Sequence, residues 1–159
     1  GAVITEAGAG RADLAHLVYI AAFALDIGES VSGALRSFER RSVALASAVQ
    51  MQDDSTTTLN PDLAASALYG SCSPPAIEAA LRRLSPQPVA TMTESVHGSA
   101  RDDISSSYLR CLRDEAVHPD HQTVMAARCD EQVDIDTDHS PFLSTTGVVA
   151  DHLERAACS

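Results

Sequence analysis

Two residues in the last third of the sequence have the types and spacing of an acid–base pair. Asp114 follows residues 108–112, a mostly apolar run that is typical of a buried strand. His139 follows a second strand-like run at residues 132–136, and a helical pattern at residues 119–128 separates the two runs. Parallel strands joined by a helix bring the residues past their ends to one edge of the sheet. We therefore expect Asp114 to meet His139 there, as two thirds of a hydrolytic triad.

Other acids and other roles compete for this pair. Asp138 adjoins His139, and Asp136 ends the same predicted strand, so either carboxylate is a possible local partner for the imidazole. A loop histidine commonly makes only a structural hydrogen bond, and Asp114 is also placed to cap the helix that begins at Pro119. We favour Asp114 as the acid because an orienting carboxylate approaches the imidazole from the end of a neighbouring strand.

A zinc site is a further alternative, because His118, His121 and Cys129 are ligand types that zinc prefers. Residues three apart share one face of a helix, which would bring the two imidazoles together. Zinc needs three or four converging ligands, and no second ligand pair follows at a fitting spacing. We therefore expect no metal and no other cofactor.

Composition limits the classes of partner. The chain has 159 residues, of which 45% are hydrophobic, and this is enough for one domain with a core. The net charge is −11 and every basic residue is arginine, so no basic patch is present for nucleic acid or an anionic membrane surface. No apolar run approaches the roughly 20 residues that span a bilayer. We expect binding to neither nucleic acid nor membranes.

The cysteines are scattered and form no Cys-x-x-Cys pair, which favours free thiols in a reducing compartment. They are Cys72, Cys111, Cys129 and Cys158. No secretory signal is visible, and we expect a cytoplasmic protein.

The elements around Asp114 and His139 alternate as in an α/β protein. Residues 1–7 have helical composition, and residues 16–23 form a continuous apolar run that is typical of a parallel strand covered on both faces. Residues 148–157 form an amphipathic helix. The order predicts about three strands and the second half of a doubly wound, mostly parallel α/β sheet.

Residues 27–100 depart from this alternation. Helical patterns occupy residues 35–51 and 62–69, a third helix begins at Ser73-Pro74-Pro75, and residues 53–58 form a polar link. We expect a helical cap or lid, inserted between two core strands of a single domain that includes residues 1–159.

Four stretches carry a resemblance to a known family. They are residues 17–30 (LVYIAAFALDIGES), 72–88 (CSPPAIEAALRRLSPQP), 108–122 (YLRCLRDEAVHPDHQ) and 136–143 (DTDHSPFL). They resemble the C-terminal portion of the α/β-hydrolase fold family, in particular the capped esterases related to plant methylesterases and hydroxynitrile lyases. In that family the order along the chain is nucleophile, acid, histidine. The resemblance implies that Asp114 is the acid and His139 the base in the hydrolysis of small carboxylic esters or similar acyl substrates.

The resemblance also implies a nucleophilic serine in a Gly-x-Ser-x-Gly turn, and this sequence contains no such turn. Gly1-Ala2-Val3-Ile4 resembles the segment that follows it, so we expect the serine to lie upstream of Gly1 and this chain alone to be inactive. Two alternatives remain open. One is a truncated, inactive homologue or ligand-binding remnant, and the other is a lyase of the hydroxynitrile type.

Two further expectations concern the surroundings of the pair. Phe23 and Phe142 follow strands at the same edge, where they would line an apolar substrate pocket or belong to ordinary core packing. The strand within residues 17–22 would leave one edge unpaired if the sheet ended there. We therefore expect the missing N-terminal half or a second chain to cover this edge.

Overall fold

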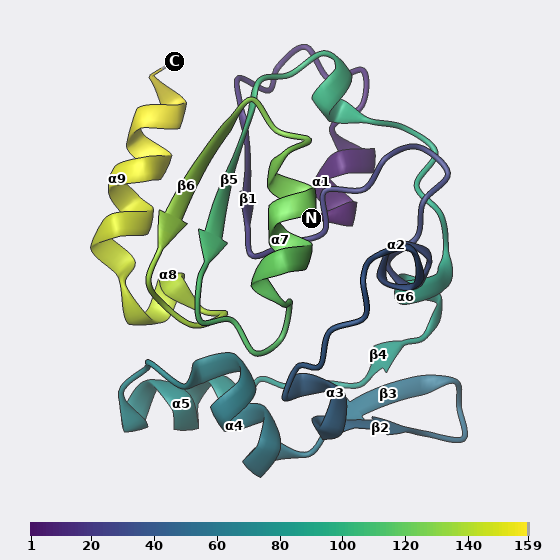
Figure 1. The fold of residues 1–159 in the computed structure, drawn as a ribbon, viewed down its shortest axis with the longest axis vertical. Coiled ribbons are helices and arrows are strands. Elements are labelled where there is room, and N and C mark those ends of the chain that lie inside the picture. The colour runs from purple at the N-terminus through teal and green to yellow at the C-terminus, as the bar shows by residue number, and fades with distance from the viewer. Residues whose placement is uncertain (159) are drawn as a thin grey trace.

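A three-stranded parallel sheet forms the centre of the protein (Figure 1). The computed structural model describes residues 1–158, and its sheet contains β1 (Leu17–Ile20), β5 (Ser106–Cys111) and β6 (Glu131–Ile135) in the order β1-β5-β6. Because β5 pairs in parallel with both neighbours, the carboxyl ends of all three strands reach one edge. The predicted C-terminal part of a doubly wound α/β sheet is confirmed.

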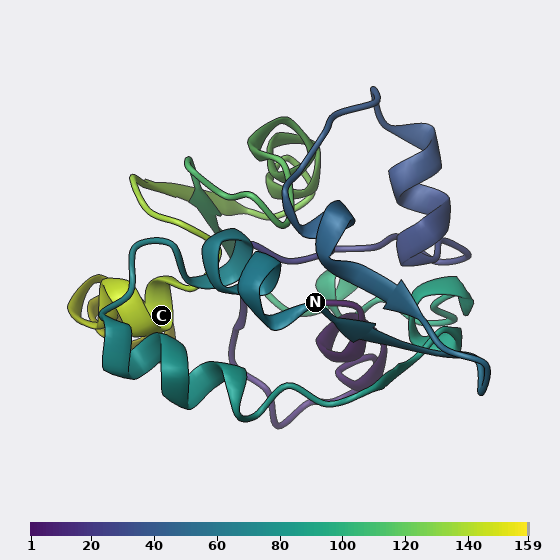
Figure 2. The same ribbon diagram turned by 90° about the horizontal axis from the view of Figure 1, so that it is seen from below.

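Helices cover both faces of this sheet (Figures 1 and 2). On one face, α1 (Ala2–Ala7) and α7 (Pro119–Ala126) enclose Tyr19 and Tyr108, which are fully buried and stacked with their ring centroids 6.4 Å apart. Thr5 of α1 forms a buried 2.8 Å hydrogen bond with the Tyr19 hydroxyl. The apolar run of the sequence is therefore explained by burial on both faces.

The opposite face packs against α9 (Thr146–Ala157), where Leu109, Ile135 and Val149 form a second buried cluster. A polar contact ties the same helix to the sheet, because His152 Nε2 lies 2.8 Å from Ser107 Oγ. The Ser107 hydroxyl also lies 3.0 Å from His16 Nε2 at the start of β1. We call His16, Ser107 and His152 the serine-bridged histidines; they lie at the amino end of β5.

Residues 27–100, called the insertion from here on, contain helices and also a second sheet (Figure 1). The helices are α2 (Val31–Ser37), α3 (Leu45–Ala48), α4 (Pro61–Tyr69), α5 (Pro74–Leu81) and α6 (Ala90–Thr93), and the 3-10 helix η1 (Ala100–Asp102) leads from the insertion to β5. The antiparallel strands are β2 (Val49–Met51), β3 (Thr56–Leu59) and β4 (Gln87–Pro88). The sequence predicts a purely helical insertion, and the second sheet shows that this prediction is wrong in part.

The predicted helix at residues 35–51 is wrong, because a β-hairpin begins inside it at β2. The turn that follows explains this. Asp54 accepts hydrogen bonds from the amide and the hydroxyl of Thr56, and Ser55 has a positive φ of 62°. The predicted polar link therefore contains the turn, and its β-branched threonines form β3. The predicted helix at residues 62–69 is confirmed, with Asn60 accepting from the amides of Asp62 and Leu63.

None of the helices within residues 1–158 is long and apolar enough to cross a membrane. All four cysteines are free thiols, and Cys111 is fully buried in β5. Burial raises the pKa of the Cys111 thiol to about 12, so it remains protonated at neutral pH.

Candidate active site at the carboxyl edge of the sheet

The structure brings Asp114 and His139 together, as their positions after β5 and β6 predict. His139 Nδ1 lies 2.8 Å from Asp114 Oδ2. The Asp114 side chain is fully buried, whereas 26% of the His139 side chain is exposed. A buried carboxylate therefore holds one side of an imidazole whose other side remains accessible.

Three further N–H groups hold the Asp114 carboxylate. The amides of Ala116 and Val117 donate to Oδ1 at 2.7 and 2.9 Å, and Gln122 Nε2 donates to Oδ2 at 2.9 Å. The turn after β5 thus wraps its own backbone around the acid. With His139, the carboxylate has four N–H donors, and these satisfy a buried charge and fix its orientation.

Sequence reasoning missed Gln122, which is fully buried in α7. Besides Asp114, its amide nitrogen donates to the carbonyl of Val117 at 2.7 Å, and its oxygen accepts from the Cys111 amide at 2.9 Å. The sequence does contain a signal for it: Gln122 precedes Met125 by three positions and Ala126 by four, which places a polar residue on the buried face of the predicted helix. Gln122 anchors the acid to both β5 and α7.

The contact with Asp114 sets the tautomer of His139. A carboxylate accepts hydrogen bonds, so Nδ1 carries the proton and Nε2 of the neutral ring keeps a free lone pair. An imidazole in this state takes a proton at Nε2 and then shares the resulting positive charge with the carboxylate. The arrangement suits a general base.

The other two acids near His139 contact different groups. Asp136 is exposed and forms an ion pair with Arg113 at 2.8 Å. Asp138 is buried and accepts the amide of Ser71 at 2.8 Å. Of the three carboxylates that the sequence offered, Asp114 is the one that forms a hydrogen bond with the imidazole.

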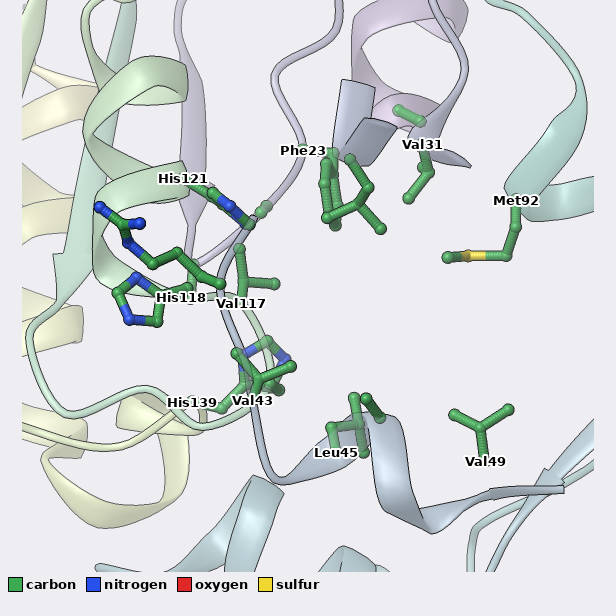
Figure 3. Close-up of a pocket in the computed structure, with 18 of the residues that line it drawn as sticks. Phe23, Val31, Val43, Leu45, Val49, Met92, Val117, His118, His121 and His139 are labelled. Atoms are coloured by element: carbon green, nitrogen blue, oxygen red, sulfur yellow. The ribbon is translucent and has the colours of Figure 1, made fainter. Parts of the chain in front are cut away.

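His139 lies at the wall of a cavity of about 720 Å³ (Figure 3). Phe23 lines this cavity from the loop after β1, and Val117 lines it from the loop after β5. The insertion contributes the apolar side chains of Val31, Leu35, Val43, Leu45, Val49 and Met92. Phe142 is not among the lining residues: it lies on α8 (Pro141–Ser144) with 49% of its surface exposed, because that short helix turns Pro141 inward instead.

His118 and His121, the two histidines considered for zinc, also line the cavity. Each of them forms a hydrogen bond with a backbone group. His118 caps α7 by accepting the amide of Asp120, and His121 Nε2 donates to the carbonyl of Glu39 at 2.8 Å. Cys129 packs against the core cluster around Tyr108. No group of three or more metal-ligating side chains converges within residues 1–158.

Comparison with known proteins gives one sequence relative and several structural ones. No protein-family model matches the chain. It is 33% identical over 169 residues to the alpha/beta hydrolase nvfD of Aspergillus novofumigatus (strain IBT 16806), and the match covers 99% of this chain and 66% of that protein. The chain thus spans slightly less than two thirds of the relative's length.

Solved structures show the same fold at lower identity. A pyrethroid hydrolase from Sphingobium faniae JZ-2 has a TM-score of 0.81 and 16% identity, with 99% of this chain and 67% of that chain covered. A methylesterase from Arabidopsis has a TM-score of 0.74 and 17% identity, with 99% and 65% covered. The parallel sheet and these likenesses agree that the chain has the fold of an α/β hydrolase, and in sequence it is similar to the fungal alpha/beta hydrolase.

Proposed function

We propose that the protein hydrolyses carboxylic esters or similar small acyl substrates through a Ser-His-Asp triad, with His139 as base and Asp114 as acid. The observation that carries this proposal is the 2.8 Å hydrogen bond between Asp114 and His139. It lies beside a cavity of about 720 Å³, which His139 helps to line. The names of the relatives, hydrolases and a methylesterase, support the same class of reaction.

In the proposed mechanism, His139 Nε2 takes the proton of a serine hydroxyl as the serine oxygen attacks the ester carbonyl. Asp114 holds the tautomer and stabilises the imidazolium. His139 then returns the proton to the leaving alcohol, and an acyl-enzyme remains. A water molecule, deprotonated by the same nitrogen, releases the acid and restores the serine.

We further propose that the chain preceding Gly1 supplies the serine, so that residues 1–159 alone would be inactive. Gly1, Ala2 and Val3 line the same cavity as His139, which would place a residue just before Gly1 near the base. A Cβ at Gly1 would lie 2.3 Å from the carbonyl oxygen of Phe23. This position therefore requires glycine, as a tight turn between strand and helix does.

The insertion would act as a cap that shapes the substrate pocket. Its apolar side chains, including Val43, Leu45 and Met92, form much of the wall opposite Phe23 (Figure 3). This lining favours a substrate with an apolar acyl or alcohol part. The net charge of −11 disfavours nucleic acid and anionic membrane surfaces as ligands.

The free edge of β1 supports a further part of the proposal. In the described sheet, β1 pairs with β5 alone, so the N–H and C=O groups along its other edge form no hydrogen bonds with another strand. We propose that a preceding segment, or a second chain, pairs there. Residues 1–159 expressed alone should then form oligomers or aggregates in size-exclusion chromatography, and a monodisperse, cooperatively melting monomer would contradict this.

A fluorophosphonate probe tests the central proposal, because it labels a serine that a neighbouring base activates. The full-length natural protein should be labelled and should hydrolyse short p-nitrophenyl esters. His139→Ala should lose both properties, whereas His97→Ala, which changes a histidine with an 83% exposed side chain, should keep them. If the folded full-length protein is not labelled, or His139→Ala is labelled equally, the proposed function is wrong.

A further inference from the structure

We propose that Asp138 is a positioning residue: its buried carboxylate fixes the loop that carries His139 and attaches this loop to the insertion. The inference rests on the proposed function, because it assigns Asp138 a role that acts through His139. Asp138 itself does not line the cavity that His139 lines.

The contacts of Asp138 reach four separate groups. Its Oδ2 accepts the amide of Ser71 at 2.8 Å, from the loop between α4 and α5. Its Oδ1 lies 3.1 Å from the Ser144 hydroxyl, 3.2 Å from the Thr137 hydroxyl and 3.3 Å from the Ser140 amide. Only 5% of the Asp138 surface is exposed. One side chain thus joins both flanks of His139, the end of α8 and the insertion.

This carboxylate has no cationic partner among the described residues, since none of their ion pairs includes Asp138. A buried negative charge without a counter-ion depends on the hydrogen bonds that it accepts. The four donors therefore hold Asp138, and Asp138 in turn holds the segments that carry these donors. Such reciprocal constraint is typical of groups that orient a functional side chain.

An amide cannot replace this carboxylate. The Thr137 and Ser144 hydroxyls can rotate to accept a hydrogen bond, but the amides of Ser71 and Ser140 can only donate. Asparagine has a single acceptor oxygen in place of two, so one of the two backbone N–H groups would face its NH₂ group. Asp138→Asn should therefore release either the insertion or the histidine loop without changing the volume of the side chain.

Two hydrogen bonds would relate the position of Asp138 to the alignment of His139 with Asp114. The Arg113 amide donates to the Thr137 carbonyl at 3.0 Å, which joins the loop of the acid to the loop of the base. Asp138 then fastens this paired unit to the Ser71 loop of the insertion. Docking of the insertion over the cavity and alignment of His139 with Asp114 are consequently linked through one carboxylate.

The test compares Asp138→Asn with Asp136→Asn in the full-length protein. Asp136 lies two residues earlier, and its side chain is 79% exposed, so it is a matched control. In Asp138→Asn we expect kcat to fall by about 10- to 100-fold, as for a small displacement of a catalytic group. We also expect faster hydrogen exchange at the Ser71 amide, and a weakened low-field NMR signal from the His139 Nδ1 proton. Asp136→Asn should leave all three unchanged.

The NMR and exchange measurements need no turnover, so they separate this inference from the proposed function. If the wild-type protein proves inactive, altered His139 and Ser71 signals in Asp138→Asn still support the positioning role. Wild-type signals at both residues in Asp138→Asn would overturn it, whatever the activity. An equal loss of kcat in Asp136→Asn would also overturn it, because the effect would then be general to the loop.

Discussion

The two ends of β5 each hold a histidine network, and the two differ in what completes the hydrogen bonds. At the carboxyl end, His139 pairs with the buried carboxylate of Asp114. At the amino end, the Ser107 hydroxyl bridges His16 and His152 on the other face of the strand. His139 lines a cavity of about 720 Å³, whereas His16 and His152 line a smaller one of about 400 Å³.

The serine-bridged histidines have a fixed direction of donation. The Arg155 guanidinium only donates, and it lies 3.4 Å from His152 Nδ1, so this nitrogen accepts. Neutral His152 then donates from Nε2 to Ser107, and Ser107 donates to His16 Nε2. Protonation of His152 would add an N–H at Nδ1, which faces the N–H groups of the Arg155 guanidinium. This network therefore favours a neutral imidazole.

The difference teaches how one residue type serves two purposes on one strand. A carboxylate partner stabilises the positive charge that a general base acquires, so His139 is suited to proton transfer. A hydroxyl and a guanidinium offer no negative charge, so His152 is suited to tying α9 to the sheet. The comparison predicts that changes at one end affect activity and changes at the other affect stability.

The largest effect is expected for Asp114→Asn in the full-length protein. The amide would present NH₂ to His139 Nδ1 and favour the tautomer with the proton on Nε2, so kcat should fall about 10⁴-fold. Ester hydrolysis at saturating substrate measures this. Asp136→Asn is the control, and a loss of less than about ten-fold for Asp114→Asn would erase the proposed contrast between the two ends.

A smaller effect, on stability, is expected for Ser107→Ala. The change leaves the Nε2–H of His152 buried without an acceptor, which costs about 1–3 kcal/mol of the free energy of unfolding. Urea denaturation measures the loss, and kcat of the folded protein should stay within about two-fold of wild type. Ser105→Ala, at an exposed position of the same segment, should change stability by less than about 0.5 kcal/mol. If Ser107→Ala impairs kcat at full stability, the two ends are not functionally separate.

The smallest effect is a pH dependence of stability at the amino end. Burial, with a contribution from Arg155, lowers the pKa of His152 below its ordinary value of 6.5. The unfolded state then binds more protons than the folded state, so His152 costs no stability above about pH 6.5 and destabilises the fold as the pH falls through that value.

Unfolding free energies measured between about pH 8 and 5 test this, across the range in which histidine titrates. His152→Gln should give a shallower decline below pH 6.5 than the wild-type protein. A decline that is the same in His152→Gln and wild type would assign the pH dependence to other groups.

The sequence by itself determined the three parallel strands, their order along the chain and the meeting of Asp114 with His139. Apolar runs of strand length and a proline-initiated helix are local signals, and parallel connection then places strand ends on one edge. The sequence failed where local patterns are ambiguous. The alanine- and valine-rich residues 35–51 fit a helix, yet tertiary pairing makes Val49–Met51 a strand.

Only the tertiary structure decided which polar side chains complete each network. Gln122 reaches Asp114 from another element, the Ser71 amide reaches Asp138 across 67 positions, and Ser107 meets His16 across 91. Such contacts depend on how helices and loops dock against the sheet, and periodicity along the chain does not encode that. The reason is physical: spacing fixes which face a residue occupies, whereas packing fixes what it meets there.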